Sequence, residues 1–203
     1  MGRPAKHDRD QLLDAAAALV AGSGPAAATM SAVAKAVGAP SGSVYHRFPD
    51  RASLLSALWL RSLTRFHTGL HEVLREEPPR AAARAAAAYV VTWSRDNLTD
   101  AAVLLAGARE LGEHDWPPTA REATDQTNTA IMTAITDLAH RLGARTPTEV
   151  DRVVLAIVDI PYTLVRRHLR TEGTIPTHAP ELAAEAAEAL LPPTVLTDDH
   201  SNR

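Results

Sequence analysis

Residues 29–48 read TMSAVAKAVGAPSGSVYHRF and predict two short helices joined by a tight turn. Thr29 is a favourable N-cap, and small apolar residues follow it on one face of the first helix. Gly38 stands where this helix must end in a left-handed conformation, which glycine adopts without strain. Pro40 keeps the preceding residue extended, and Ser41 can cap the second helix. Two helices around a glycine-containing turn form the arrangement that reads a major groove.

The second short helix, expected over 42–47, presents polar side chains to the outside. Val44 and Phe48 stand at i, i+4 spacing and are expected to face the core. The remaining side chains project elsewhere: Ser43, Tyr45, His46 and Arg47. Outward hydrogen-bonding groups on a short second helix are what contact with a DNA groove requires.

This region resembles the DNA-binding domain of the TetR (tetracycline repressor) family of regulators. The resemblance covers about residues 10–60 and rests on an amphipathic first helix, Thr29, Gly38, the run SGSVYHRF and Arg51 three residues after Phe48. It implies that ten residues contact DNA: Thr29, Ser31, Lys35, Ser41, Gly42, Ser43, Tyr45, His46, Arg47 and Arg51.

The sequence departs from the usual family pattern at Pro40 and Gly42. Glycine at position 42 allows close approach of the backbone but removes a side chain that would read a base. Direct readout is therefore expected to rest on Ser31, Ser43 and His46.

The composition favours helices and excludes several classes of function. The chain has 203 residues, of which 45% are apolar, 22% are charged and about a fifth are alanine, the strongest helix former. The absence of cysteine excludes disulfides, cysteine nucleophiles and Cys-ligated zinc. The net charge of −3 excludes a basic nucleic-acid coat, although residues 1–51 alone hold six basic and four acidic side chains.

Prolines mark the joints between about nine predicted helices, and no strand is predicted. Thirteen of the fourteen prolines fall before, between or after stretches with helical periodicity. The helices are expected over residues 8–21, 30–37, 42–47, 51–76, 80–96, 100–111, 118–143, 147–171 and 180–191. The fold class is therefore all-α, with a three-helix helix-turn-helix domain at 1–50 and a flexible tail at 192–203. The resemblance implies that the helices between them, at 51–191, form an effector-binding and dimerisation bundle.

The basic N-terminal residues bear on DNA contact, and the longest apolar runs bear on membrane insertion. Arg3, Lys6 and Arg9 form a basic arm that would either reach a DNA groove or be disordered. The longest apolar runs, 85–93 and 153–158, are too short to cross a bilayer, and no secretory signal is evident. We therefore expect a cytoplasmic protein with no membrane contact.

The helix expected over 147–171 is apolar on more than one face, which suits contact with its own core and with a partner chain. Together with the helix at 180–191 it would complete a four-helix interface in a homodimer. The residues expected at this interface are Val158, Val165, Leu169, Leu182, Ala186 and Leu190. Two-fold symmetry matches the two half-sites of a palindromic operator.

A ligand pocket in the bundle would be lined by apolar side chains with a few polar ones. The candidates are Phe66, Leu70, Tyr89, Trp93, Asn128, Met132, Asp159 and Tyr162, and core filling is the alternative role of the aromatic ones. Asp159 lies in the apolar run VVLAIVDIPYTLV, so it needs a protein partner, a water or a ligand; a ligand corner and a salt bridge to an arginine of the same chain are the two roles expected. Pro161 leaves the carbonyl of Ile157 free, and a kink is expected there.

These features predict a homodimeric repressor that leaves double-stranded operator DNA when a small, mostly apolar effector binds. Two alternatives remain: an activator or co-repressor-type regulator of the same fold, and a helical ligand-binding or scaffold protein with a weakened head. His67 and His71 have metal-binding spacing, but no third ligand accompanies them. Phosphate-binding glycine loops, dinucleotide fingerprints and nucleophile elbows do not occur in the sequence. We therefore expect no enzyme activity, no cofactor and no metal.

Overall fold

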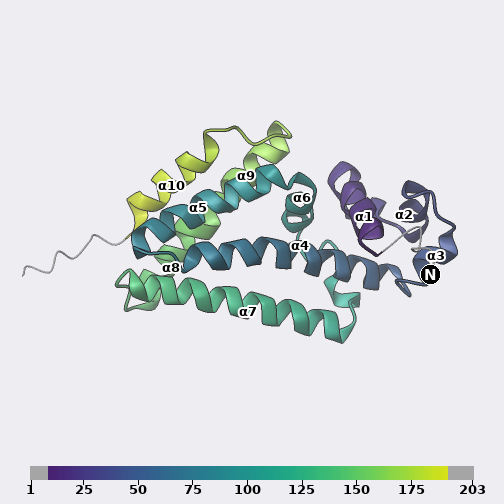
Figure 1. The fold of residues 1–203 in the computed structure, drawn as a ribbon, viewed down its shortest axis with the longest axis horizontal. Coiled ribbons are helices and arrows are strands. Elements are labelled where there is room, and N and C mark those ends of the chain that lie inside the picture. Colours follow the sequence, from purple (N-terminus) through teal and green to yellow (C-terminus); the bar gives the residue numbers. More distant parts are fainter. Residues whose placement is uncertain (1–8, 192–203) are drawn as a thin grey trace, which may run out of the picture.

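The computed structural model describes residues 9–191 as an assembly of helices without strands (Figure 1). The head comprises α1 (Arg9–Ser23), α2 (Met30–Ala36) and α3 (Ser41–Tyr45), with the 3-10 turn η1 (Pro25–Ala27) between the first two. The bundle comprises α4 (Arg51–Leu74), α5 (Pro79–Asp96), α6 (Leu98–Ala106), η2 (Glu113–Asp115), α7 (Pro118–Arg141), α8 (Pro147–Val154), η3 (Leu155–Asp159), α9 (Ile160–Thr171) and α10 (Ala179–Leu190). The all-α prediction with an N-terminal helix-turn-helix is confirmed.

Local signals in the sequence set where these helices begin. The Thr29 hydroxyl accepts a hydrogen bond from the Ala32 N–H at 3.1 Å, and the Asp50 carboxylate accepts one from the Ser53 N–H at 2.7 Å. Thr146 and Glu149 form a capping box at the start of α8. Prolines stand in the first turns of α5, α7, α8 and α10, where a missing N–H costs no helical hydrogen bond.

Buried apolar side chains form two clusters that meet along α4. The first joins α1–α3 to the N-terminal half of α4 and extends to Val103 of α6 and to Trp116. The second joins the C-terminal half of α4 to α5, α7, α8, α9 and α10. The division falls between Leu63 and Leu70, so the head shares its core with α4. A domain boundary at residue 50 remains a prediction, because the first cluster continues past it.

Helix α4 runs from the head into the bundle, and α7 lies alongside it (Figure 1). Helix α6 packs against both α1 and α4. Helix α10 packs mainly on α5, and both helices contribute small side chains to the shared core: Ala82, Ala83, Ala86, Ala183 and Ala187. Our sequence-based expectation paired α10 with the helix at 147–171, which it contacts less extensively.

Two predicted helices differ from the observed ones. The helix expected over 100–111 ends at Ala106, because Gly107 has φ +84° and ψ 151°, a conformation that favours glycine. The helix over 147–171 continues unbroken but contains the π-helical turn η3, in which the N–H of Ile160 donates to the carbonyl of Leu155. Pro161 explains this turn, since its ring would collide with the Ile157 carbonyl in a regular α-helix.

The basic arm residues Arg3 and Lys6 and the tail at 192–203 lie outside the described residues. Among the described helices, none combines the length and the apolar character needed to cross a membrane.

Candidate nucleic-acid interface and ligand cavity

Helix α3 is held to the head by two apolar side chains; it exposes Gly42 and Tyr45, while Ser43 is half-buried. Val44 is fully buried, and Phe48 just beyond the helix is 2% exposed. Tyr45 is 54% exposed, which is unusual for a large aromatic side chain, and Gly42 and His46 are also exposed. The backbone of Ser41 begins α3, but its side chain lies outside what the structure describes.

The supporting helix α2 exposes three of the predicted contact residues beside α3. Thr29, Ser31 and Lys35 are all exposed, and the hydroxyls of Thr29 and Ser31 lie 3.2 Å apart. Because α2 and α3 pack together, these side chains and the exposed face of α3 belong to the same small head.

Arg51 has partners inside the head. Its Nε donates to the carbonyl of Ala28 at 3.1 Å, and its Nη2 donates to the carbonyl of Pro25 at 2.6 Å. The guanidinium thus ties the start of α4 to the segment before α2. A phosphate contact of Arg51 remains a prediction, as does one of the half-buried Arg47.

A cavity of about 190 Å³ lies where the two core clusters meet. Twelve side chains from α4, α5, α6 and α9 line it: Trp59, Leu63, Phe66, His67, Val90, Trp93, Ser94, Ala101, Leu104, Leu105, Tyr162 and Val165. The structure therefore brings three of the eight predicted pocket residues together, namely Phe66, Trp93 and Tyr162. The Phe66 ring lies edge-on to Trp93, with centroids 5.1 Å apart.

The other predicted pocket residues lie elsewhere. Leu70 is buried in the bundle core, and Tyr89 packs behind Phe66 and donates a hydrogen bond to its carbonyl at 3.0 Å. Asn128 and Met132 line a separate shallow groove on α7.

Asp159 lies on the surface and does not line the cavity. Its side chain is exposed in a depression that Arg167 also lines, and it has no ion pair or hydrogen bond within residues 9–191. A solvated carboxylate needs neither a ligand nor an internal arginine, so the apolar run around it did not imply burial.

The residues expected at a dimer interface divide into two groups. Val165 is only 2% exposed within a single protomer and lines the cavity, so it is not available to a partner chain. Leu182 is 44% exposed, and the others are half-buried: Val158, Leu169, Ala186 and Leu190.

Two polar groups in the cavity wall were not predicted there. Trp59 and His67 are about nine-tenths buried, and neither Nε1 of Trp59 nor Nδ1 of His67 has a hydrogen-bond partner among residues 9–191. Burial lowers the pKa of His67 to about 4, with a smaller contribution from the nearby charge of His71 and an opposing one from a hydrogen bond to the backbone of Thr127. His67 is therefore neutral at pH 7.

A glycine on α4 positions one aromatic ring behind the cavity. A Cβ at Gly69 would lie 2.8 Å from Cε2 and Cζ of Tyr89, which is closer than any tolerated contact. The single glycine inside the predicted helix is the sequence feature that could have indicated this close approach.

Comparison with known proteins identifies the head. The family described as "Bacterial regulatory proteins, tetR family" matches residues 12–58, the span that holds α1–α3 and the start of α4. The head of the chain is thus similar to the DNA-binding domain of this family. No curated protein matches it in sequence.

Several solved structures of similar length share the whole fold of this chain. The fatty acid degradation regulator FadR from Bacillus halodurans superposes with a TM-score of 0.72 at 15% identity, covering 96% of this chain and 99% of that one. FadR from Bacillus subtilis, solved with stearoyl-CoA, gives 0.71 at 15% identity and covers 91% and 98%. A transcriptional regulator from Rhodococcus sp. Rha1 gives 0.71 at 22% identity and covers 91% and 94%.

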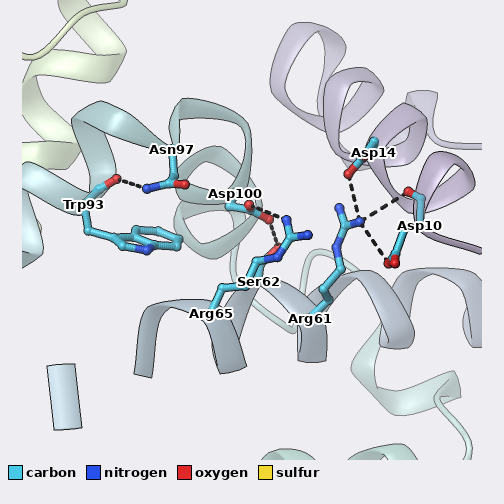
Figure 2. Close-up of polar contacts among 8 residues, drawn as sticks. All are labelled: Asp10, Asp14, Arg61, Ser62, Arg65, Trp93, Asn97 and Asp100. Atoms are coloured by element: carbon cyan, nitrogen blue, oxygen red, sulfur yellow. Dashed lines mark hydrogen bonds and ion pairs between the residues drawn. The ribbon is translucent and has the colours of Figure 1, made fainter. Parts of the chain in front are cut away.

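Polar contacts tie α4 to the head and to α6 (Figure 2). Arg61 reaches α1, where its Nη1 lies 2.8 Å from the Asp14 carboxylate and 3.6 Å from that of Asp10. Its neighbours Ser62 and Arg65 both bond the buried Asp100 of α6, Arg65 at 3.1 Å.

The joint between α5 and α6 continues these contacts to the cavity wall. The amide of Asn97 donates to the carbonyl of Trp93 at 2.9 Å (Figure 2). Cavity and head are thus connected through adjacent turns of α4 and through α6. Within residues 9–191, no group of three or more His, Asp or Glu side chains is arranged to hold a metal.

Proposed function

We propose that this protein is a homodimeric TetR-family repressor that binds operator DNA through α2 and α3 and releases it when a small molecule fills the cavity. The observation that carries this proposal is the position of the cavity between the two core clusters. Trp59 and Leu63 belong to the cluster that includes the head, whereas Val165 belongs to the bundle. A ligand between them is in contact with both parts.

The contacts around the cavity supply a route from ligand to head. A ligand shifts an equilibrium only by its differential affinity for two states, so the states must differ at the cavity wall. Leu104 and Ala101 place α6 in that wall, and α6 also packs on α1. Asp100 and Arg61 hold α6 to α4 and α4 to α1. Displacement of α6 or α4 by a ligand would therefore change the orientation of the head.

The dimer is proposed to form through the outer faces of η3, α9 and α10. Leu155 and Leu182 are large apolar side chains that are more than two-fifths exposed in one protomer. Apolar surface of this kind favours contact with another chain. A two-fold dimer would present two α3 helices to major grooves one helical turn, about 34 Å, apart.

The sign of regulation separates the proposal from its main alternative. In a repressor, the effector lowers operator affinity and raises transcription. In an activator or co-repressor-type regulator of the same fold, the effector raises operator affinity. A head without DNA affinity would correspond to a ligand-binding or scaffold protein.

A mobility-shift assay with the DNA upstream of the protein's own gene tests the DNA-binding part. Replacing Tyr45 and His46 together with Ala is expected to weaken binding at least about tenfold, because each lost base or phosphate contact costs about 1–3 kcal/mol. Binding by the unmodified protein should also fall steeply with salt. His114→Ala, on the exposed turn η2, is the matched control and should bind normally. Unchanged affinity of the double variant would contradict the assigned recognition helix.

A further inference from the structure

We infer that the cavity binds a compact, uncharged, ring-containing molecule with a polar group at each end, an acceptor for Trp59 and a donor for His67. This inference rests on the proposed function, because it describes the chemistry of the effector. It is carried by two buried polar atoms that the protein itself leaves unpaired in the cavity wall.

Trp59 and His67 are the two cavity residues whose hydrogen bonds are incomplete. Both line the cavity, and they are 9% and 8% exposed. Nε1 of Trp59 and Nδ1 of His67 have no partner in the described part of the chain. The third polar side chain deep in the wall, Ser94, is already satisfied, since its hydroxyl donates to the Val90 carbonyl at 2.7 Å. Buried polar atoms in native proteins are normally paired, so a bound molecule is the partner that these two lack.

The two atoms require opposite hydrogen-bonding groups on the ligand. An indole nitrogen can only donate, so Trp59 needs an acceptor oxygen or nitrogen. His67 is neutral, and its hydrogen bond to the Thr127 backbone favours the charged form of the ring, as a bond to a carbonyl does. The ring proton therefore belongs on Nε2, which leaves Nδ1 with a free lone pair. A hydroxyl or N–H of the ligand would satisfy it.

The spacing of these residues sets the shape of the molecule. Trp59 and His67 are eight residues apart on α4, which places their Cα atoms about 12 Å apart along the helix. A ligand with one polar group at each end suits this separation. A para-disubstituted ring has about the required length, because two hydrogen bonds of about 2.8 Å add to the span of its substituents.

The volume and lining exclude large or charged ligands. A cavity of about 150 Å³ holds benzene in another protein, and the present one of about 190 Å³ is only somewhat larger. An acyl-CoA, such as the one bound by FadR from Bacillus subtilis, is far larger and anionic. None of the twelve lining side chains is a carboxylate, an arginine or a lysine. Aromatic faces attract cations, but surroundings that keep His67 unprotonated disfavour a positive charge.

Calorimetric titration of the full-length protein at pH 7 with matched compounds tests the inference. The probes are 4-hydroxyacetophenone, which carries both groups; acetophenone, which carries the acceptor only; 4-ethylphenol, which carries a hydroxyl only; and octanoyl-CoA. We expect 4-hydroxyacetophenone to bind at least about tenfold more tightly than either single-group compound. Equal affinity for these three, tighter binding of octanoyl-CoA or no binding by any probe would overturn the inference.

Two variants test which side chain binds each polar group of the ligand. His67→Phe should remove the advantage of 4-hydroxyacetophenone over acetophenone. Trp59→Phe should remove its advantage over 4-ethylphenol. Ser94→Ala is the control, because it removes a lining hydroxyl that is already paired, and it should preserve both preferences. Equal losses for every compound in a folded variant would mean that the two side chains only fill space.

A mobility shift with each compound separates this inference from the proposed function. If 4-hydroxyacetophenone binds as expected but leaves operator affinity unchanged, the ligand chemistry holds and the proposed repressor mechanism fails. If octanoyl-CoA releases the operator and 4-hydroxyacetophenone does not, the repressor mechanism holds and the ligand chemistry fails.

Discussion

His67 couples protonation to folding, because its imidazole is buried as the neutral form. The pKa of His67 is about 4 in the folded chain and about 6.5 in the unfolded one, so the unfolded chain binds more protons between these values. The contribution to stability is complete above about pH 6.5 and is lost as the pH falls towards 4, by up to about 3 kcal/mol. Denaturant unfolding at pH 5 and pH 7.5 measures it.

The variant His67→Phe should show a smaller loss of stability between these two pH values. His140→Phe changes an exposed histidine and serves as the control. An identical pH dependence in the unmodified protein and in His67→Phe would show that His67 does not carry this effect.

Replacing Gly42 with alanine should change the stability of the head and its affinity for DNA in opposite directions. A Cβ at this position meets no atom within 4 Å, and alanine favours the helix, so Gly42→Ala should raise the free energy of unfolding by about 0.5–1 kcal/mol. If the α3 backbone approaches phosphate closely, the same methyl group should weaken operator binding. Chemical denaturation and a mobility shift measure the two effects, and unchanged operator affinity would argue against a close backbone approach at position 42.

At the scale of elements, the packing of α4 on α5 depends on one glycine. Gly69→Ala places a methyl group against the Tyr89 ring, and overpacking of this kind costs about 1–3 kcal/mol. We expect a lower melting temperature and a disturbed cavity wall, because Tyr89 packs on Phe66. Gly22→Ala, in the open last turn of α1, is the matched control and should not destabilise the protein. Equal melting temperatures for the two variants would contradict the proposed packing role.

The positions of the helices could be predicted closely from the sequence, whereas the cavity could not. Caps such as Thr29 and Thr146 and prolines in first turns act within a few residues, so they predict helix starts from local sequence alone. The C-terminal end of α6 was missed because the helical pattern continued past Gly107, whose backbone conformation ends the helix.

The cavity joins side chains from four helices, and their meeting is decided by tertiary packing. Phe66, Trp93 and Tyr162 were anticipated because aromatic residues commonly line pockets. Trp59 and His67 were not, since their burial without partners leaves no trace in the sequence. Asp159 was placed inside by its apolar neighbours, although its side chain faces solvent.

At the scale of the whole molecule, the proposed dimer depends on apolar side chains that one protomer leaves exposed. Leu182→Glu should leave the protomer folded, because Leu182 is 44% exposed while the opposite face of α10 packs on α5. A carboxylate in an apolar interface lacks a partner, so the variant should be monomeric and bind operator more weakly. Light scattering during gel filtration measures the mass.

Leu98→Glu is the control, because Leu98 is 42% exposed and lies on α6. If Leu182→Glu remained dimeric, α10 would not belong to the interface.

The π-helical turn η3 acts as a one-residue shift in the phase of the apolar pattern. One extra residue in a turn rotates all that follows by about 100°. Val165 is thereby aligned with Val153 and Ile157 on the buried face, a place that uninterrupted helical spacing would give to Leu164. Converting this turn to a regular α-helical turn without deleting a residue would rotate the rest of α9 by about 100° and turn Val165 and Tyr162 away from the cavity. Deleting one residue within 155–159 at the same time would keep both side chains at the cavity. The width of a single turn thus decides which side of α9 contributes to the cavity wall.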